Sequence, residues 1–149
     1  MAPLKSILVC VPDSVDFSDP DPDQTQARGI QLVTNWDDSV IGVVGWSDGG
    51  WDALALAAEH QDLPRLAIVS TPFPDDIDGL IDRVDLSLIT SKALLIFGSQ
   101  DPLTGHRHGV SWQKRLSNAR LEMVPGGGHD LLEPKWGRVL SHLAPRTRQ

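Results

Sequence analysis

The sequence predicts an α/β domain with a parallel β-sheet, and three features of the chain support this fold class. Short apolar runs alternate with segments of helical spacing, which is the pattern of strand–helix–strand units. Most of the runs are apolar at every position, as in strands buried on both faces of a sheet. The 149 residues are 40% hydrophobic, enough for one domain with a sizeable core. We therefore expect a single domain over residues 1–149, with about five parallel strands in sequential order and helices on both faces.

The predicted strands and helices follow one another along the chain. Strands are expected at residues 6–11, 40–45, 65–70, 93–98 and 120–124. Helices are expected at residues 24–35, 50–60, 76–84, 110–118 and 133–143, and Pro134 suits the first helical position of the last one. The Pro- and Asp-rich segment 16–24 is predicted to be a loop. Because crossovers between parallel strands are right-handed, four helices would lie on one face of the sheet and only the last on the other.

The charge and composition of the chain exclude several classes of protein. The 20 acidic and 13 basic residues give a net charge of −7, which argues against a nucleic-acid partner. No apolar stretch is long enough to span a membrane, and the start MAPLKSILVCV lacks the pattern of a signal peptide, so we expect a cytoplasmic protein with no membrane partner. Cys10 is the single cysteine and is expected to be a buried, unreactive thiol. His106 and His108 have no third ligand nearby in the sequence, so we expect no metal site.

The stretch Gly45-Trp46-Ser47-Asp48-Gly49 joins a predicted strand to a predicted helix. Small residues two positions before and two positions after a serine suit a sharp strand-to-helix turn, because neighbouring backbone comes close there. Such a turn holds the serine hydroxyl exposed at the carboxyl ends of the strands, where open α/β sheets bind ligands. The alternative is an ordinary glycine-rich turn that happens to contain a serine.

Two residues further along the chain favour the first interpretation. Asp101 comes shortly after the predicted strand 93–98, and His129 lies in a glycine-rich loop after the strand 120–124. Either residue alone could be explained by turn chemistry or by a solvated loop. The order Ser, Asp, His, with each residue at the carboxyl end of a predicted strand, is the order of a nucleophile, its orienting acid and its base. We predict that Ser47 is the nucleophile, Asp101 the acid and His129 the base.

These motifs resemble the α/β-hydrolase superfamily, and most closely its valacyclovir hydrolase (biphenyl hydrolase-like) group. The resemblance runs over about residues 40–143 and rests on GWSDGG, LPRLAIVSTP, FGSQDPLTG and VPGGGHD. It implies hydrolysis of small carboxylic esters or amides through an acyl-enzyme on Ser47, with neither metal nor cofactor. The partner would be a small-molecule ester.

The amino-terminal part of the chain departs from this family. Only one strand precedes the strand before Ser47, the usual loop that donates to an oxyanion is missing, and residues 70–91 are too few for a lid domain. In one alignment the loop after residue 11 matches the loop after the family's fourth strand. In the other, strand 6–11 takes the central place beside strand 40–45, and the backbone N–H of Asp13 or Ser14 joins that of Asp48 as an oxyanion donor. The alternative to an esterase is a weakly active or inactive hydrolase-like module for binding or regulation.

Two further expectations concern the walls of the site and self-association. Trp46 and Phe73 are candidates for an apolar pocket wall, and the alternative is that both belong to the core. We expect a homodimer, because one helix would leave much of one sheet face uncovered and strand 6–11 would be an exposed edge. The alternative is that the loop over residues 12–24 covers the gap and the protein is monomeric.

Overall fold

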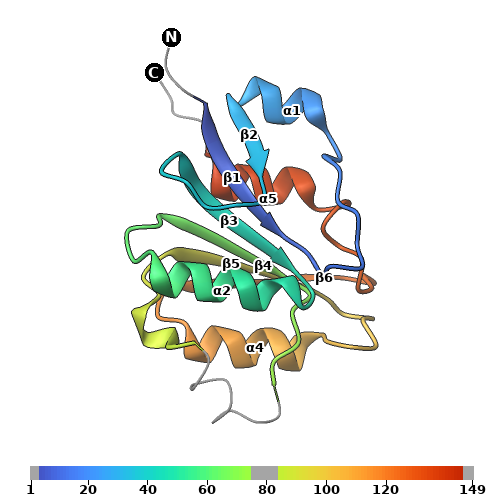
Figure 1. The fold of residues 1–149 in the computed structure, drawn as a ribbon. Coiled ribbons are helices and arrows are strands. Elements are labelled where there is room, and N and C mark those ends of the chain that lie inside the picture. The colour runs from blue at the N-terminus through green and yellow to red at the C-terminus, as the bar shows by residue number, and fades with distance from the viewer. Residues whose placement is uncertain (1–3, 75–83, 146–149) are drawn as a thin grey trace.

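The sheet has six parallel strands in the order β2-β1-β3-β4-β5-β6 (Figure 1). The structure is a computed structural model that describes residues 4–74 and 84–145. The strands are β1 (Lys5–Cys10), β2 (Ile30–Val33), β3 (Val40–Trp46), β4 (Arg65–Val69), β5 (Lys92–Gly98) and β6 (Ala119–Val124). All neighbouring strands pair in parallel, which confirms the predicted fold class. The helix predicted over residues 76–84 lies almost wholly outside the described residues.

The expected count of five strands is wrong, because a strand replaces the second half of the helix predicted over residues 24–35. Helix α1 (Pro22–Ala27) begins after Asp21, whose side chain accepts a hydrogen bond from the Gln24 N–H. The helix cannot continue past Gly29, which has a φ of +68° in the left-handed region that favours glycine. The next four residues form β2, a short strand at the edge of the sheet.

The extra strand changes how the helices are distributed over the two faces. Helices α2 (Gly49–Glu59) and α4 (His106–Arg115) cover one face together with the short 3₁₀ helix η1 (Leu86–Leu88), whereas α1 and α5 (Trp136–Leu143) lie on the other (Figure 1). The prediction of four helices against one is therefore wrong. Strand β2 pairs with one side of β1, and β3 pairs with the other side. The crossover from β1 to β2 therefore runs in the opposite direction along the sheet from the later crossovers. Because crossovers are right-handed, α1 lies on the same face as α5.

Strand β1 lies inside the sheet and not at its edge. Cys10 pairs with Gly45 of β3, while the other side of β1 pairs with β2. The placement of this strand beside the strand before Ser47 is confirmed, and its expected role as an edge strand is wrong. Burial, reinforced by the nearby Asp52 carboxylate, raises the pKa of the Cys10 thiol to about 12, in agreement with the predicted unreactive cysteine.

A separate apolar cluster fills each face of the sheet. One contains Leu54 of α2 and Trp112 of α4, and the other contains Trp136 and Leu140 of α5. Phe17, in the loop after β1, packs against Trp136 with ring centroids 5.4 Å apart. The two reasons given for a homodimer, a face covered by one helix and an exposed first strand, are thus not met, and the homodimer itself stays a prediction. None of the helices within residues 4–74 and 84–145 has the length and apolarity needed to cross a bilayer.

The helices near the carboxyl end start at different residues from those predicted. Helix α4 begins at His106, four residues before the predicted start, directly after Gly105 with its φ of +122°. Helix α5 begins at Trp136, and Pro134 lies in the turn before it. Both shifts concern helix ends and leave the order of elements unchanged.

Candidate active site

Ser47 lies in a sharp turn between β3 and α2, as the sequence predicts. Its φ of +55° is in the left-handed region, and its N–H donates to the Val69 carbonyl oxygen at 2.8 Å. A Cβ at Gly45 would lie 2.5 Å from the Gly50 Cα, and a Cβ at Gly49 would lie 2.2 Å from the Cys10 carbonyl oxygen. The backbone therefore passes too close for any side chain at these positions, which explains why the serine is flanked by glycines.

Asp101 lies in the turn after β5 with its side chain buried. One carboxylate oxygen accepts from the Leu103 N–H at 2.8 Å, and the other accepts from the Thr104 hydroxyl and from the His129 ring. Burial alone would raise the pKa of Asp101, but the hydrogen bonds from Thr104, His129 and Leu103 outweigh it and hold the pKa below its ordinary value. The carboxyl group is therefore ionised at neutral pH.

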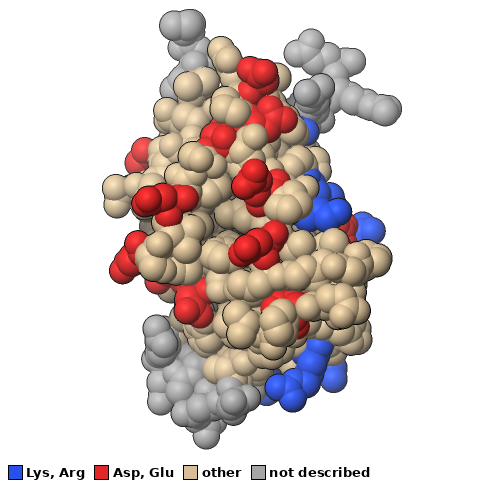
Figure 2. Space-filling model, turned by 90° about the vertical axis from the view of Figure 1, so that its right-hand side faces the viewer, with Lys and Arg blue, Asp and Glu red and all other residues tan. Residues whose placement is uncertain are grey.

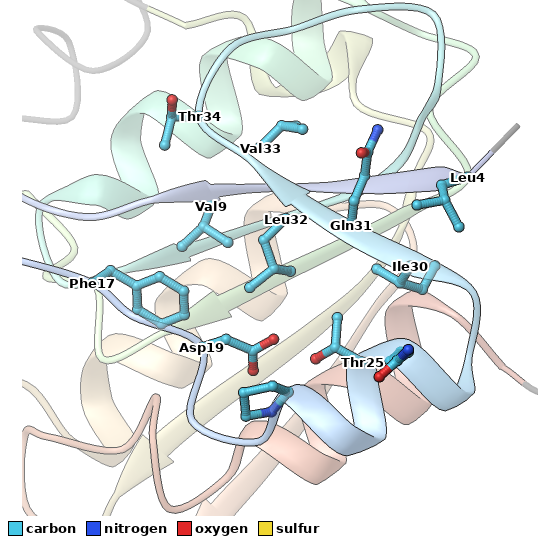
Figure 3. Close-up of a pocket in the computed structure, with 12 residues that line it drawn as sticks. Leu4, Val9, Phe17, Asp19, Thr25, Ile30, Gln31, Leu32, Val33 and Thr34 are labelled. Atoms are coloured by element: carbon cyan, nitrogen blue, oxygen red, sulfur yellow. The ribbon is translucent and has the colours of Figure 1, made fainter.

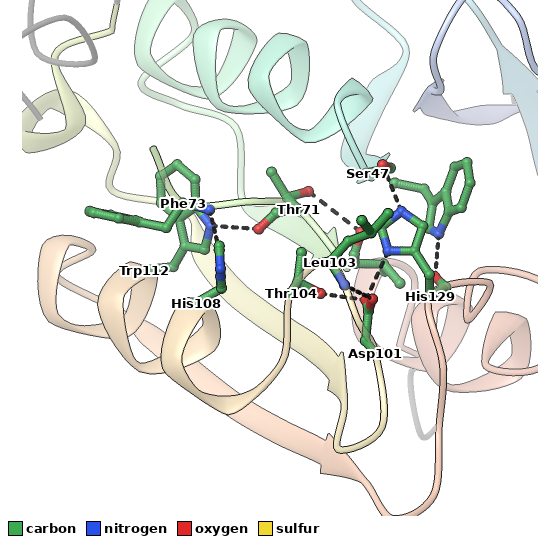
Figure 4. Close-up of polar contacts among 11 residues, drawn as sticks. Ser47, Thr71, Phe73, Asp101, Leu103, Thr104, His108, Trp112 and His129 are labelled. Carbon is green, nitrogen blue, oxygen red and sulfur yellow. Dashed lines mark hydrogen bonds and ion pairs between the residues drawn. The ribbon is translucent and has the colours of Figure 1, made fainter. Parts of the chain in front are cut away.

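His129 joins Ser47 to Asp101 in one hydrogen-bonded sequence, which we refer to as the Ser–His–Asp chain (Figure 4). Its Nδ1 lies 2.8 Å from Asp101 Oδ2, and its Nε2 lies 2.8 Å from Ser47 Oγ. Because an ionised carboxylate can only accept, Nδ1 carries a proton, and in the neutral ring Nε2 accepts from the serine hydroxyl. The structure thus brings together the three residues that the sequence singled out from the ends of three different strands.

The loop that carries His129 is fixed by contacts with β5. The Gln100 N–H donates to the Gly127 carbonyl oxygen at 2.9 Å, and a Cβ at Gly98 would lie 2.2 Å from the same oxygen. Gly126 has a φ of +71°, a backbone conformation that favours glycine. The glycines before His129 therefore allow a tight turn packed against the neighbouring strand.

Trp46 makes a contact with this loop that sequence reasoning did not find. Its indole N–H donates to the His129 carbonyl oxygen at 2.9 Å, and the two rings lie 5.1 Å apart at an angle of 54°. Trp46 directly precedes Ser47, so one residue of the strand-to-helix turn holds the backbone of the histidine. Thr104 is also a residue that the sequence analysis missed, although a hydroxyl three residues after Asp101 is a common spacing for such a hydrogen bond.

The residues predicted to stabilise an oxyanion lie in two segments, the start of α2 and the loop after β1. Asp48 is exposed at the start of α2, and its N–H has no backbone acceptor among the described residues. Asp13 and Ser14 form an exposed turn closed by a hydrogen bond from the Val15 N–H to the Pro12 carbonyl oxygen. The loop that carries this turn leaves β1 directly against Gly49, as the second alignment expects.

Phe73 packs at the edge of the core below α4. Its ring meets that of Trp112 edge-on with centroids 4.8 Å apart, and its N–H donates to His108 Nδ1 at 2.7 Å. His106 is exposed at the first position of α4. Across the described part of the chain, no three His, Cys, Asp or Glu side chains gather as a metal site requires.

Two of the cavities that border the loop after β1 share a lining residue. One, of about 760 Å³, lies between this loop and the start of α5, and Trp46 is among its lining residues. The other, of about 630 Å³, lies beside the edge strand β2 and α1 (Figure 3). Phe17 lines both cavities. Trp46 lines the first cavity, whereas Phe73 lines neither and packs, partly buried, against the core; the roles predicted for both residues stay predictions.

Comparison with known proteins identifies the fold. Neither a protein-family model nor a curated protein sequence matches this chain. Among solved structures, S-formylglutathione hydrolase from Staphylococcus aureus matches with a TM-score of 0.72 at 15% identity, over 95% of this chain and 82% of that one. An α/β-hydrolase from the metagenome of Mar Chica lagoon sediments matches with a TM-score of 0.70 at 14% identity, over 92% of this chain and 89% of that one. Est1E from Butyrivibrio proteoclasticus matches with a TM-score of 0.68 at 14% identity, over 92% and 85%.

These likenesses define the class: the chain has the fold of an α/β hydrolase, reduced to its core. The strand-to-helix turn at Ser47 fits this fold, in which the turn lies at the carboxyl end of a parallel strand. The likenesses do not single out the valacyclovir hydrolase group among the enzymes that share the fold.

Proposed function

We propose that this protein is a serine hydrolase that cleaves small carboxylic esters. The observation that carries the proposal is the Ser–His–Asp chain, with two hydrogen bonds of 2.8 Å and an ionised carboxylate at its end. The names of structural neighbours support it, since the Pyrococcus furiosus protein Pf2001 is an esterase and a Rhodothermus marinus protein contains an esterase domain. Amides are a second class that the same chemistry can cleave.

In the proposed reaction, Ser47 Oγ attacks the ester carbonyl carbon while His129 Nε2 takes the hydroxyl proton. Asp101 stabilises the imidazolium that forms and keeps the ring in its orientation. Collapse of the tetrahedral intermediate expels the alcohol, which receives the proton from Nε2, and leaves an acyl group on Ser47. A water molecule then attacks the acyl-enzyme, again with His129 as the base, and releases the acid.

The oxyanion of the intermediate would be held by backbone N–H groups. The Asp48 N–H is the first candidate, because it follows the nucleophile at the start of α2. The second candidate is the N–H of Asp13 or Ser14 in the loop after β1. Losing one such donor costs about 2.7–4 kcal/mol, which is roughly a hundred- to a thousand-fold in rate. If the second donor is absent, we expect a slow esterase.

A fluorophosphonate probe tests the proposal, because it reacts covalently with activated serines. We expect the wild-type protein to be labelled, Ser47→Ala to be unlabelled, and the matched control Ser111→Ala on α4 to be labelled as the wild type is. A panel of p-nitrophenyl esters of increasing chain length then measures turnover. A folded wild-type protein that is neither labelled nor active on any ester would contradict the proposal and support the binding or regulatory module.

A further inference from the structure

The cavity of about 760 Å³ is lined by Trp46 and Asp130, the chain neighbours of Ser47 and His129. Val15 and Phe17 from the loop after β1 line one side, and Asp130, which follows the histidine, lines the other. Trp46 also lines it, and its indole N–H bonds to the His129 carbonyl oxygen at 2.9 Å. A group attached to an ester carbonyl at Ser47 therefore has this cavity within reach.

The inner walls of the cavity are aromatic. Trp136 is 2% exposed and packs against Phe17 with ring centroids 5.4 Å apart, and both residues line the cavity together with Trp46. Aromatic rings bury large apolar area, and their faces attract positive charge. Alkyl or aryl groups therefore suit these walls better than strongly hydrated groups do.

The rim of the same cavity is acidic. Asp16, Asp21, Asp130 and Glu133 line it, and all four are exposed. No Lys, Arg or His is found among the described residues that line it. Figure 2 looks onto the molecule from the side toward which the strand arrows of Figure 1 point, and Asp and Glu side chains are spread over this face.

Four strands begin with a basic residue at their first or second position, at the opposite end of the sheet. Lys5, Arg65 and Lys92 are the first residues of β1, β4 and β5, and Arg120 is the second residue of β6. Carboxylates occur at that end too, since Asp37 and Asp38 lie just before β3 and Asp62 lies just before β4. The local excess of negative charge at the cavity comes from its four rim carboxylates, which attract cations and repel anions.

We propose that this cavity binds the apolar group of the substrate and selects it by charge. Esters in which this group ends in a positive charge, away from the scissile carbonyl, are favoured, and those in which it ends in a carboxylate are rejected. The aromatic walls take the apolar part, and the carboxylates at the rim face its charged end. The inference rests on the proposed ester hydrolysis and adds the class of substrate to it.

Three esters of matched shape test the inference. They are the p-nitrophenyl esters of a trimethylammonium-tipped hexanoic acid, of its tert-butyl-tipped carbon isostere, and of adipic acid as the monoester. We expect kcat/KM to fall in that order at low ionic strength, with at least about a ten-fold difference between the first and the last. The difference should shrink at high salt, because exposed charges are screened beyond about 10 Å at 0.1 M.

Two variants test whether the carboxylates at the cavity rim cause the preference for cationic esters. The double variant Asp16→Asn with Glu133→Gln should lower the ratio of kcat/KM between cationic and anionic esters by about three-fold. The control Asp62→Asn removes an exposed carboxylate that lies just before the amino end of β4, and it should leave the ratio unchanged. An equal loss of selectivity in both variants would show that the selectivity comes from the overall charge of the protein and not from the cavity. This result would overturn the inference.

The inference and the proposed function fail in different ways. Equal kcat/KM for the three esters, with hydrolysis that depends on Ser47, would overturn the charge selection alone. If no ester is cleaved and the fluorophosphonate does not react, the proposed function fails. Calorimetric titration of Ser47→Ala with the trimethylammonium-tipped amide and its tert-butyl isostere then tests whether the cavity prefers a cationic group. Tighter binding of the cation supports the inference, and equal or undetectable binding overturns it.

Discussion

Replacing Trp46 with Phe removes the indole N–H that bonds to the His129 backbone and keeps an aromatic ring beside the imidazole. In the wild-type protein this N–H donates at 2.9 Å, and the two rings lie 5.1 Å apart. The histidine is also held by its hydrogen bond to Asp101 and by the Leu131 N–H, which donates to the same His129 carbonyl oxygen at 3.0 Å, within a loop that contains three glycines. We therefore expect Trp46→Phe to loosen the position of Nε2 relative to Ser47.

The size of the effect follows from the hydrogen bond that is lost. A hydrogen bond between neutral groups contributes about 0.5–1.5 kcal/mol net. If all of this free energy restrains His129, and about 1.4 kcal/mol corresponds to a ten-fold change in rate, acylation should slow by roughly two- to thirteen-fold. A short ester such as p-nitrophenyl acetate does not extend into the neighbouring cavity, so its kcat should fall while its KM stays nearly constant.

The assay is the rate of fluorophosphonate labelling together with kcat and KM on the acetate ester. The matched control is Trp36→Phe, which changes a tryptophan that stacks on His60 at the end of α2, away from the histidine loop. Melting temperatures of both variants report any general loss of structure. An unchanged labelling rate in Trp46→Phe, or an equal loss in Trp36→Phe, would refute the argument that this hydrogen bond positions His129.

Three further predictions concern stability and reactivity. Gly45→Ala should destabilise the protein by about 1–3 kcal/mol in urea unfolding, because its Cβ would lie 2.5 Å from the Gly50 Cα, whereas Gly128→Ala, with no atom within 4 Å of its Cβ, should be nearly neutral. Cys10 should resist iodoacetamide at about pH 8 in the folded protein and react once the protein is unfolded, because burial raises the pKa of its thiol to about 12. Burial also lowers the pKa of His142 below its ordinary 6.5, so the unfolded chain binds a proton at a higher pH than the folded protein does. The free energy of unfolding should be at its full value above pH 6.5 and should fall as the pH drops through the lowered pKa of the folded protein. The His142→Gln variant should show a flatter dependence of stability on pH.

The sequence was sufficient to predict the Ser–His–Asp chain because each of its residues lies within five positions of the end of an apolar run. A buried parallel strand reads as such a run, and the carboxyl ends of parallel strands meet at one edge of the sheet. The proximity of residues far apart in the sequence, such as Ser47 and His129, can therefore be predicted from the positions of the strands alone. The distances and the direction of each hydrogen bond needed the structure.

The first part of the fold was harder to predict, because β2 has only four residues and lies at an edge. Its residues continue the apolar spacing of α1, so a single long helix fitted the pattern equally well. Gly29 was the signal that separates the two elements, and one glycine within a helical pattern is weak support for a break. The errors in strand count, helix distribution and the position of β1 all follow from this one segment.

The contact of Trp46 with His129 joins residues that are 83 positions apart, and no local pattern in the sequence encodes it. A tryptophan beside a serine is equally compatible with a pocket wall and with the core. Such contacts depend on how two loops approach each other above the sheet, which the spacing of apolar residues does not determine.

The loop after β1 is a different segment of the chain from the three that carry Ser47, Asp101 and His129. Ser47, Asp101 and His129 are held by β3, β5, β6 and one another, whereas residues 11–21 reach the site as one wall of the cavity. Under the proposed function, changes at the cavity-lining positions of this loop would alter which molecules enter without moving the proton-transfer groups. The turn at Asp13 and Ser14 is a candidate oxyanion donor and would have to be kept, so substrate range can diverge or be redesigned mainly at positions 15–21.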